Sequence, residues 1–381
     1  MIEETTDFKE IEEEKDEELD DLKEPFAPKA IDIVLEQPSI YSIIARIQND
    51  EIDLNPEFQR KANLWPQTAM SRLIESILVR LPLPAFYFDA SKEDKWLVVD
   101  GLQRLYTLKR FVVDCEEKYR DNPNDTPLRL TGLEFLKEYE GKTYTDLPPV
   151  MKRRMNEAHI TAYLIKPGTP EYIKYSIFYR INTGGLVLNA QEIRNALNQK
   201  GQAGPYLKEI SETLSFKRIV NVSDKRMQDR ELILRHIAYR LFPVENYKPS
   251  MKKFLNQAMT ELNNQPKEKV DRLKTDFLAA LELAHDIFGQ HVFSKSLVDL
   301  RKKPILNRGL FEVLTVLFAG MSEEEKKLLL LKKNEFLNDF KRLLEDRTFD
   351  SYITASTADT TAVKERFKRI HELIKNQTRS Q

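Results

Sequence analysis

Two kinds of hydrophobic pattern alternate through the N-terminal half of the chain. Short apolar runs of the kind found in strands occur at residues 31–35, 52–54, 85–88, 96–99 and 160–165. Apolar residues recur every three or four positions, as in amphipathic helices, at residues 39–48, 65–81, 102–112, 151–155, 172–181 and 190–198. This order predicts an α+β domain with a small sheet.

From residue 205 onward the pattern is almost wholly helical. Four apolar stripes at helical spacing run through residues 277–288, 306–317, 336–344 and 363–374. We interpret these stripes as the core of a mainly α-helical C-terminal region. The pattern thus divides the chain into residues 1–24, 25–204 and 205–381.

The first 24 residues differ from the rest in charge. They hold thirteen Asp or Glu and three Lys, so residues 25–381 carry a net charge of +9 although the whole chain is at −1. Dense like charge with few large apolar groups predicts a disordered acidic tail. The tail is either a solubilising extension or a segment that covers a basic groove and competes with nucleic acid.

Composition excludes several classes of protein. One cysteine, Cys115, excludes a disulfide framework and a cysteine-rich zinc site. The five histidines are not closely paired, and the chain has no P-loop, no Gly-x-Gly-x-x-Gly and no nucleophile elbow. Without a long apolar run or a basic N-terminal leader, we expect a cytoplasmic protein with no membrane contact.

The sharpest chemical signal is the pair Asp100-Gly101. A short apolar run precedes it, and helical spacing begins at Leu102. Such a corner gathers the unpaired N–H groups of a helix start with Gln103 and Arg104, which suits a phosphate. Asp100 could hold Mg²⁺ or orient a water, while Arg104 could contact phosphate oxygens. The alternative is an ordinary corner in which the Asp caps the helix and the Arg pairs with a surface carboxylate.

A second signal lies where the 172–181 helix pattern ends. The sequence Asn182-Thr183-Gly184-Gly185 is typical of a helix stop whose backbone N–H groups can face a ligand. A tight corner between two helices explains the same residues without a ligand.

Three motifs together resemble one family. They are Asn55-Pro56-Glu57-Phe58-Gln59-Arg60 followed by Trp65, then Asp100-Gly101-Leu102-Gln103-Arg104, then Arg180-Ile181-Asn182-Thr183-Gly184-Gly185 with Gln191-Glu192-Ile193-Arg194. In this order they resemble the N-terminal domain of GmrSD-type modification-dependent restriction endonucleases. That domain is similar to ParB and sulfiredoxin, so the resemblance implies a small ParB/sulfiredoxin-like mixed sheet in residues 25–204. It covers residues 35–245.

The resemblance implies a site that binds and hydrolyses a nucleoside triphosphate with Mg²⁺. Asp100, Gly101, Gln103 and Arg104 match the family loop, whereas Leu102 stands where the family has a Gln. The catalytic residues would be Asp100, also the metal ligand, with Gln103 and Arg104; the binding residues would be Gln59, Arg60, Gly101, Asn182, Thr183 and Gly184.

The resemblance further implies a bacterial anti-phage defence protein that couples the nucleotide to sensing of DNA, including modified or phage DNA. No His-Asn-His nuclease domain is recognisable after the family domain, so cutting would need a partner nuclease or another effector; an oligomer is compatible with the sequence. Two alternatives remain. One is a non-catalytic DNA-binding module that uses the basic surface, including Arg218, Arg235 and Arg240, and the other is a ParB-like metal-dependent nuclease.

Overall fold

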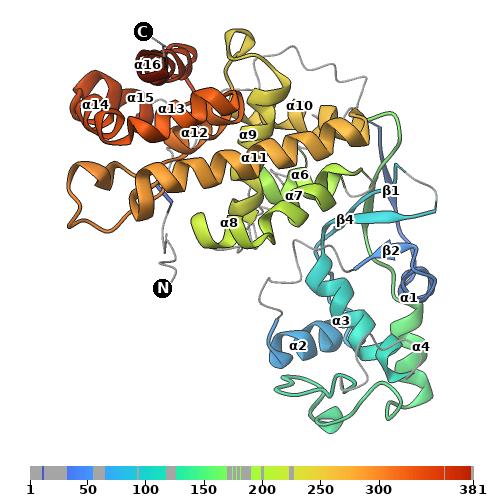
Figure 1. Cartoon of the computed structure of the whole chain (residues 1–381). Coiled ribbons are helices and arrows are strands. Elements are labelled where there is room, and N and C mark those ends of the chain that lie inside the picture. Colours follow the sequence, from blue (N-terminus) through green and yellow to red (C-terminus); the bar gives the residue numbers. More distant parts are fainter. Residues whose placement is uncertain are drawn as a thin grey trace. The chain divides into compact units, whose positions relative to one another are not determined.

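The computed structural model describes two compact units. It describes residues 11–12, 32–54, 65–91, 94–116, 126–169, 174, 177, 181, 190–198, 201–222, 227–355 and 357–378. Phe26–Asn189 form the first unit, here called the sheet unit, and Ala190–Gln381 with Met1–Pro25 form the second, the helical unit (Figure 1). Figure 1 also gives the element labels used below.

Within the described residues, five strands form one mixed sheet in the order β1-β5-β3-β4-β2. They are β1 (Ile33–Glu36), β2 (Ile52–Asp53), β3 (Phe86–Asp89), β4 (Trp96–Asp100) and β5 (Ala162–Ile165). β3 is parallel to β5 and antiparallel to β4; β2 is parallel to β4, and β1 is antiparallel to β5. The predicted α+β class with a small mixed sheet is confirmed.

Alternation along the strands buries one face of this sheet. Phe86, Phe88, Val98 and Leu164 belong to the same apolar core as the buried residues of the neighbouring helices. These helices are α1 (Ile40–Gln48), α2 (Gln67–Leu78), α3 (Leu102–Val112) and α4 (Pro149–Glu157), with short 3₁₀ turns η3 (Val113–Cys115) and η5 (Lys137–Tyr139). The apolar residues that alternate along the strands and those that recur every three or four positions along the helices therefore pack into one core.

Helix α2 is shorter than its apolar pattern predicted. Apolar spacing continued to Leu81, but the helix ends at Leu78 and Leu81 is half exposed. Arg80 has a φ of 66°, the left-handed conformation that commonly terminates a helix. The prolines that follow keep the chain extended until β3 begins.

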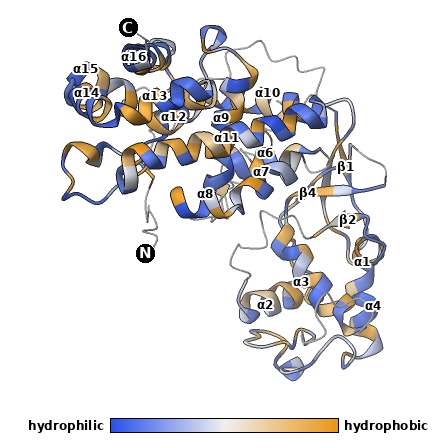
Figure 2. Cartoon of the chain, viewed as in Figure 1, coloured by the Kyte–Doolittle hydropathy of each residue, from blue (hydrophilic) through white to orange (hydrophobic). Residues whose placement is uncertain are grey.

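The helical unit confirms the predicted helical C-terminal region. Its α-helices are α6 (Ala190–Leu197), α7 (Ala203–Ser211), α8 (Leu214–Ile219), α9 (Gln228–Leu241), α10 (Met251–Asn264), α11 (Lys267–Phe288), α12 (Arg308–Ala319), α13 (Glu323–Leu331), α14 (Lys333–Glu345), α15 (Arg347–Thr354) and α16 (Thr360–Thr378). Its 3₁₀ turns are η8 (Val244–Asn246), η9 (Gly289–His291) and η10 (Lys295–Val298). Hydrophobic and hydrophilic residues alternate along these helices (Figure 2), and the buried ones form a single core.

Two residues of the predicted acidic tail are described, and both are bound to the helical unit. Ile11 forms a parallel bridge with Leu306, and the backbone N–H of Glu12 donates to the Leu306 carbonyl. The Glu12 backbone carbonyl accepts from Arg308. Backbone hydrogen bonds thus attach Ile11 and Glu12 to the helical unit, and the disorder of the acidic tail stays a prediction.

Among the described residues, no helix has both the length and the apolar character that a bilayer span requires.

Candidate functional site

The predicted corner is present, and Gly101 shapes it. β4 ends at Asp100, Gly101 has a φ of 101°, and α3 begins at Leu102. A Cβ at Gly101 would lie 2.5 Å from Cδ1 of Phe86, closer than real Cβ contacts. The corner therefore needs glycine both for its backbone conformation and for its close approach to the core.

Arg104 is held in place by three oxygen atoms. Its Nη1 donates to the Pro84 carbonyl, and its Nη2 donates to the Ala85 carbonyl at 3.0 Å and to Oδ2 of Asp100 at 2.8 Å. The guanidinium also lies over the Phe86 ring, with Cζ 4.2 Å from the ring centroid. Burial lowers the pKa of Arg104, and the Asp100 carboxylate raises it by a smaller amount.

This geometry differs from the ordinary-corner interpretation, in which Asp100 would cap the helix. Arg104 pairs with Asp100 of the corner itself, one helical turn away, and Asp100 does not cap α3. The Arg104 side chain is 9% exposed and that of Asp100 35% exposed. Within this pair, the carboxylate is the group that a ligand can reach, and the guanidinium holds it.

Gln103 connects the corner to the end of the first family motif. Its Oε1 accepts a hydrogen bond from the backbone N–H of Trp65 at 3.2 Å. Trp65, which follows that motif, thus lies beside the first turn of α3. Gln59 and Arg60 themselves lie outside the described residues.

The double-glycine signal also falls outside the described part of the chain. Asn182, Thr183 and Gly184 belong to residues 182–189, which the structure does not describe. Only Lys174, Ile177 and Ile181 are described from the preceding segment, and all three are helical.

No group of three His, Cys, Asp or Glu side chains that could hold a metal ion occurs among the described residues. Mg²⁺ commonly uses one or two protein carboxylates and takes its remaining ligands from phosphates and water. Asp100, partly exposed, fits that minimal role.

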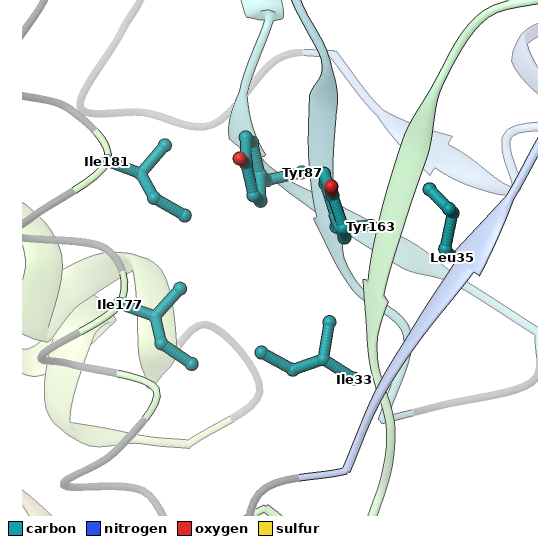
Figure 3. A pocket seen from close by; sticks show the side chains of 6 residues that line it. All are labelled: Ile33, Leu35, Tyr87, Tyr163, Ile177 and Ile181. Atoms are coloured by element: carbon teal, nitrogen blue, oxygen red, sulfur yellow. The ribbon is translucent and has the colours of Figure 1, made fainter.

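Sequence reasoning missed two tyrosines beside the corner. Tyr87 pairs with Asp100 across β3 and β4, and with Tyr163 across β3 and β5. The two rings stack with centroids 4.9 Å apart and lie side by side on the sheet face opposite the core (Figure 3). The signal was a Tyr between apolar neighbours in each strand, Phe86-Tyr87-Phe88 and Ala162-Tyr163-Leu164, because alternation puts the middle residue on the other face.

The last motif of the resemblance, Gln191-Glu192-Ile193-Arg194, lies in the helical unit. Arg194 of α6 donates from Nε to Oε1 of Gln191 at 2.8 Å and lies 3.4 Å from Glu231 of α9. Among the described residues, three arginines lie within 4 Å of Glu231, and two of them, Arg194 and Arg235, are buried, while Arg308 is partly buried. These residues therefore form an internal charge network.

Three of the basic residues considered for a DNA-binding surface are paired with acids. Arg218 pairs with Glu282, Arg240 with Asp276, and the buried Arg235 with Glu231 and Glu312. A cation that is already paired gains less from a DNA phosphate, because it must first give up its partner. These contacts disfavour a phosphate-binding track through Arg218, Arg235 and Arg240.

Comparison with known proteins finds one family match, over the part of the chain that contains the corner. No curated protein and no solved structure matches the chain. Residues 40–199, which include β2 to β5, the corner and α6, match the family described as GmrSD restriction endonuclease, N-terminal domain. The match is consistent with an N-terminal GmrSD-type domain in residues 40–199.

Proposed function

We propose that this chain is a restriction-type phage-defence protein whose GmrSD N-terminal domain binds a nucleoside triphosphate with Mg²⁺ and hydrolyses it. The observation that carries the proposal is the corner itself, where a partly exposed carboxylate lies next to a glycine turn and a helix start within the family domain. In the proposal, the nucleotide state is coupled to DNA or to a partner effector.

The backbone of α3 would meet the phosphates. The first N–H groups of a helix have no partner within the helix, and α3 has no side-chain cap among the described residues. These N–H groups and the positive end of the helix dipole favour an anion at this position.

Asp100 would hold the metal ion with the oxygen that Arg104 does not contact. Arg104 binds Oδ2, which fixes the carboxylate and leaves Oδ1 for Mg²⁺. We therefore assign Arg104 a positioning role and not the direct phosphate grip expected from the sequence. When bound, Mg²⁺ would neutralise charge on the phosphate oxygens.

Gln103 would link nucleotide binding to the first motif. Its side chain holds the backbone of Trp65, five residues after Arg60. Leu102 offers no polar side-chain contact where the family has a Gln, so water positioning depends on Gln103 and Asp100.

The test is calorimetry of ATP, GTP, CTP and UTP with Mg²⁺ on the full chain. We expect at least one triphosphate to bind, and Asp100→Asn to weaken that binding roughly tenfold or more, since a charge-assisted contact contributes about 1.5–3 kcal/mol. Arg104→Lys should weaken it as well, because a lysine cannot contact the Pro84 carbonyl and Asp100 with two separate nitrogens as the guanidinium does.

Asp114→Asn is the matched control. It breaks the 2.9 Å ion pair with Lys109 at the other end of α3, and should leave nucleotide affinity unchanged. Absence of binding by the wild type, or equal binding by wild type and Asp100→Asn, would show the proposal to be wrong. Mg²⁺-dependent DNA nicking that Asp100→Asn abolishes, without triphosphate binding, would favour the nuclease alternative.

A further inference from the structure

An apolar cavity opens on the sheet face opposite the core. Its volume is about 470 Å³, within the range of small-molecule sites, and Ile33, Leu35, Tyr87, Tyr163, Ile177 and Ile181 line it. Figure 3 shows Ile177 and Ile181 on one side of the tyrosine pair and Leu35 on the other. The cavity thus combines flat aromatic surfaces with aliphatic walls.

The segment that carries the two isoleucines is anchored to the sheet. Lys174, Ile177 and Ile181 each have a helical backbone conformation, and Lys174 is the one that contacts the sheet. Nζ of Lys174 lies 3.2 Å from Oδ2 of Asp89 and donates to Oγ of Ser91 at 2.6 Å. Because Lys174 and Asp89 are both buried, this ion pair holds Lys174 against the sheet.

The cavity adjoins the Asp100 corner through the strand register. Leu35 pairs with Tyr163, Tyr163 with Tyr87, and Tyr87 with Asp100. Tyr163 and Asp100 are therefore two strand spacings apart, about 10 Å. Burial raises the pKa of Tyr87, with smaller effects of Tyr163 and Asp100 in the same direction and of Arg104 in the opposite one, consistent with a tyrosine close to the corner.

We propose that this cavity binds the base of the nucleotide, with the Tyr87 ring as its stacking surface. The proposal rests on the proposed function, because the phosphates must occupy the neighbouring corner. Aromatic rings stack on every nucleobase, and the two tyrosine hydroxyls supply polar groups that can orient it. A ribose would bridge the span from Tyr87 to Asp100.

The test compares a probe with a base and a probe without one. Binding of the preferred nucleoside triphosphate and of inorganic tripolyphosphate, both with Mg²⁺, is measured by calorimetry on the full chain. Tyr87→Leu keeps an apolar residue in β3 and removes the ring. It should weaken triphosphate binding about tenfold or more, as expected for loss of base stacking, and leave tripolyphosphate binding unchanged.

A second variant approaches the cavity from its other wall. Ile177→Trp fills the space and should exclude the base, with the same selective loss of nucleoside triphosphate affinity. Tyr41→Ala is the control, because Tyr41 is an exposed tyrosine on α1. It should not change the affinity for either probe.

The outcomes separate the base site from the proposed function. If wild type binds both probes and both cavity variants bind the nucleoside triphosphate as tightly as wild type, the base site is wrong and the corner stands. Equal losses for the two probes would also overturn the base site, because they would indicate damage to the corner. If wild type binds neither probe, the proposed function fails and the base site fails with it.

Discussion

Gly101 is constrained both by its backbone conformation and by the core, and it lies beside the proposed site. Its φ of 101° is unfavourable for any residue with a Cβ, and that Cβ would also contact Phe86 at 2.5 Å. We expect Gly101→Ala to lower the free energy of unfolding of the sheet unit by more than the roughly 1–2 kcal/mol that a left-handed backbone conformation costs alone. Urea unfolding followed by tryptophan fluorescence measures this, since Trp65 and Trp96 both belong to that unit.

Two other glycines separate the backbone cost from the contact. Gly141 also has a positive φ, 75°, but a Cβ there would meet nothing within 4 Å, and Gly168 has open space without a positive φ. The expected order of destabilisation is Gly101→Ala, then Gly141→Ala, then Gly168→Ala. A Gly101→Ala protein no less stable than Gly141→Ala would contradict the role given to Phe86.

At the residue scale, the sequence predicted that a strand turns into a helix at Asp100-Gly101, but it could not predict which oxygens the Arg104 guanidinium contacts. The run of apolar residues before Asp100-Gly101 and the helical spacing after it are local, so the sequence contains them. Arg104 is directed by the carbonyls of Pro84 and Ala85, which β3 brings beside α3. Which of several available oxygens a guanidinium contacts depends on this tertiary placement.

At the element scale, helix α2 holds the loop that follows α3. Glu75 is buried, and its carboxylate accepts the backbone N–H groups of Glu134, Phe135 and Leu136 at 2.7–2.9 Å. Burial alone raises the pKa of Glu75, but the three hydrogen bonds together lower it below its usual value. The charged form is thus the one that the loop requires.

We expect Glu75→Gln to lower the free energy of unfolding by about 1–3 kcal/mol, because the amide places an NH₂ group against backbone donors. The measurement is the urea midpoint by tryptophan fluorescence at pH 7. Glu134→Gln removes the same charge from an exposed ion pair with Arg72 and should change the free energy by less than about 0.5 kcal/mol. Similar losses in the two variants would argue against the loop anchor.

Element positions were more predictable than element ends and pairings. Strands β3, β4 and β5 and helix α1 follow from apolar periodicity, with Ser39 accepting the Ser42 N–H as the cap of α1. The end of α2 depends on the left-handed Arg80, and the stacking of Tyr87 on Tyr163 depends on the register of two strands far apart in the sequence. Apolar spacing alone indicates neither of them.

At the scale of the whole molecule, stability toward acid depends on a histidine that the proposed chemistry does not use. His236 lies on α9 in the core of the helical unit, fully buried, with its ring centroid 4.7 Å from that of Phe277. Neither ring nitrogen has a hydrogen-bond partner within the described residues. Burial, aided by Arg240, lowers the pKa of His236 from 6.5 to about 3.

A histidine whose pKa is lower in the folded state favours folding only while it is neutral. Its contribution is complete above pH 6.5, the value for the unfolded chain, and is lost as the pH falls toward about 3 at about 1.4 kcal/mol per pH unit. His236→Gln cannot gain this proton. The unfolding free energy of wild type relative to His236→Gln should therefore decrease by about 2.5 kcal/mol between pH 6.5 and pH 4.5.

Far-UV circular dichroism during urea unfolding measures this difference, because the signal comes mainly from the helices. His371→Gln removes an imidazole from an exposed position on α16 and serves as the control. Carboxylates that lose stability in acid are common to all three proteins, so they cancel in the comparison and leave the His236 contribution. Parallel pH profiles for wild type and His236→Gln would mean that the folded helical unit admits a charged imidazole, which a fully buried ring without a hydrogen-bond partner forbids.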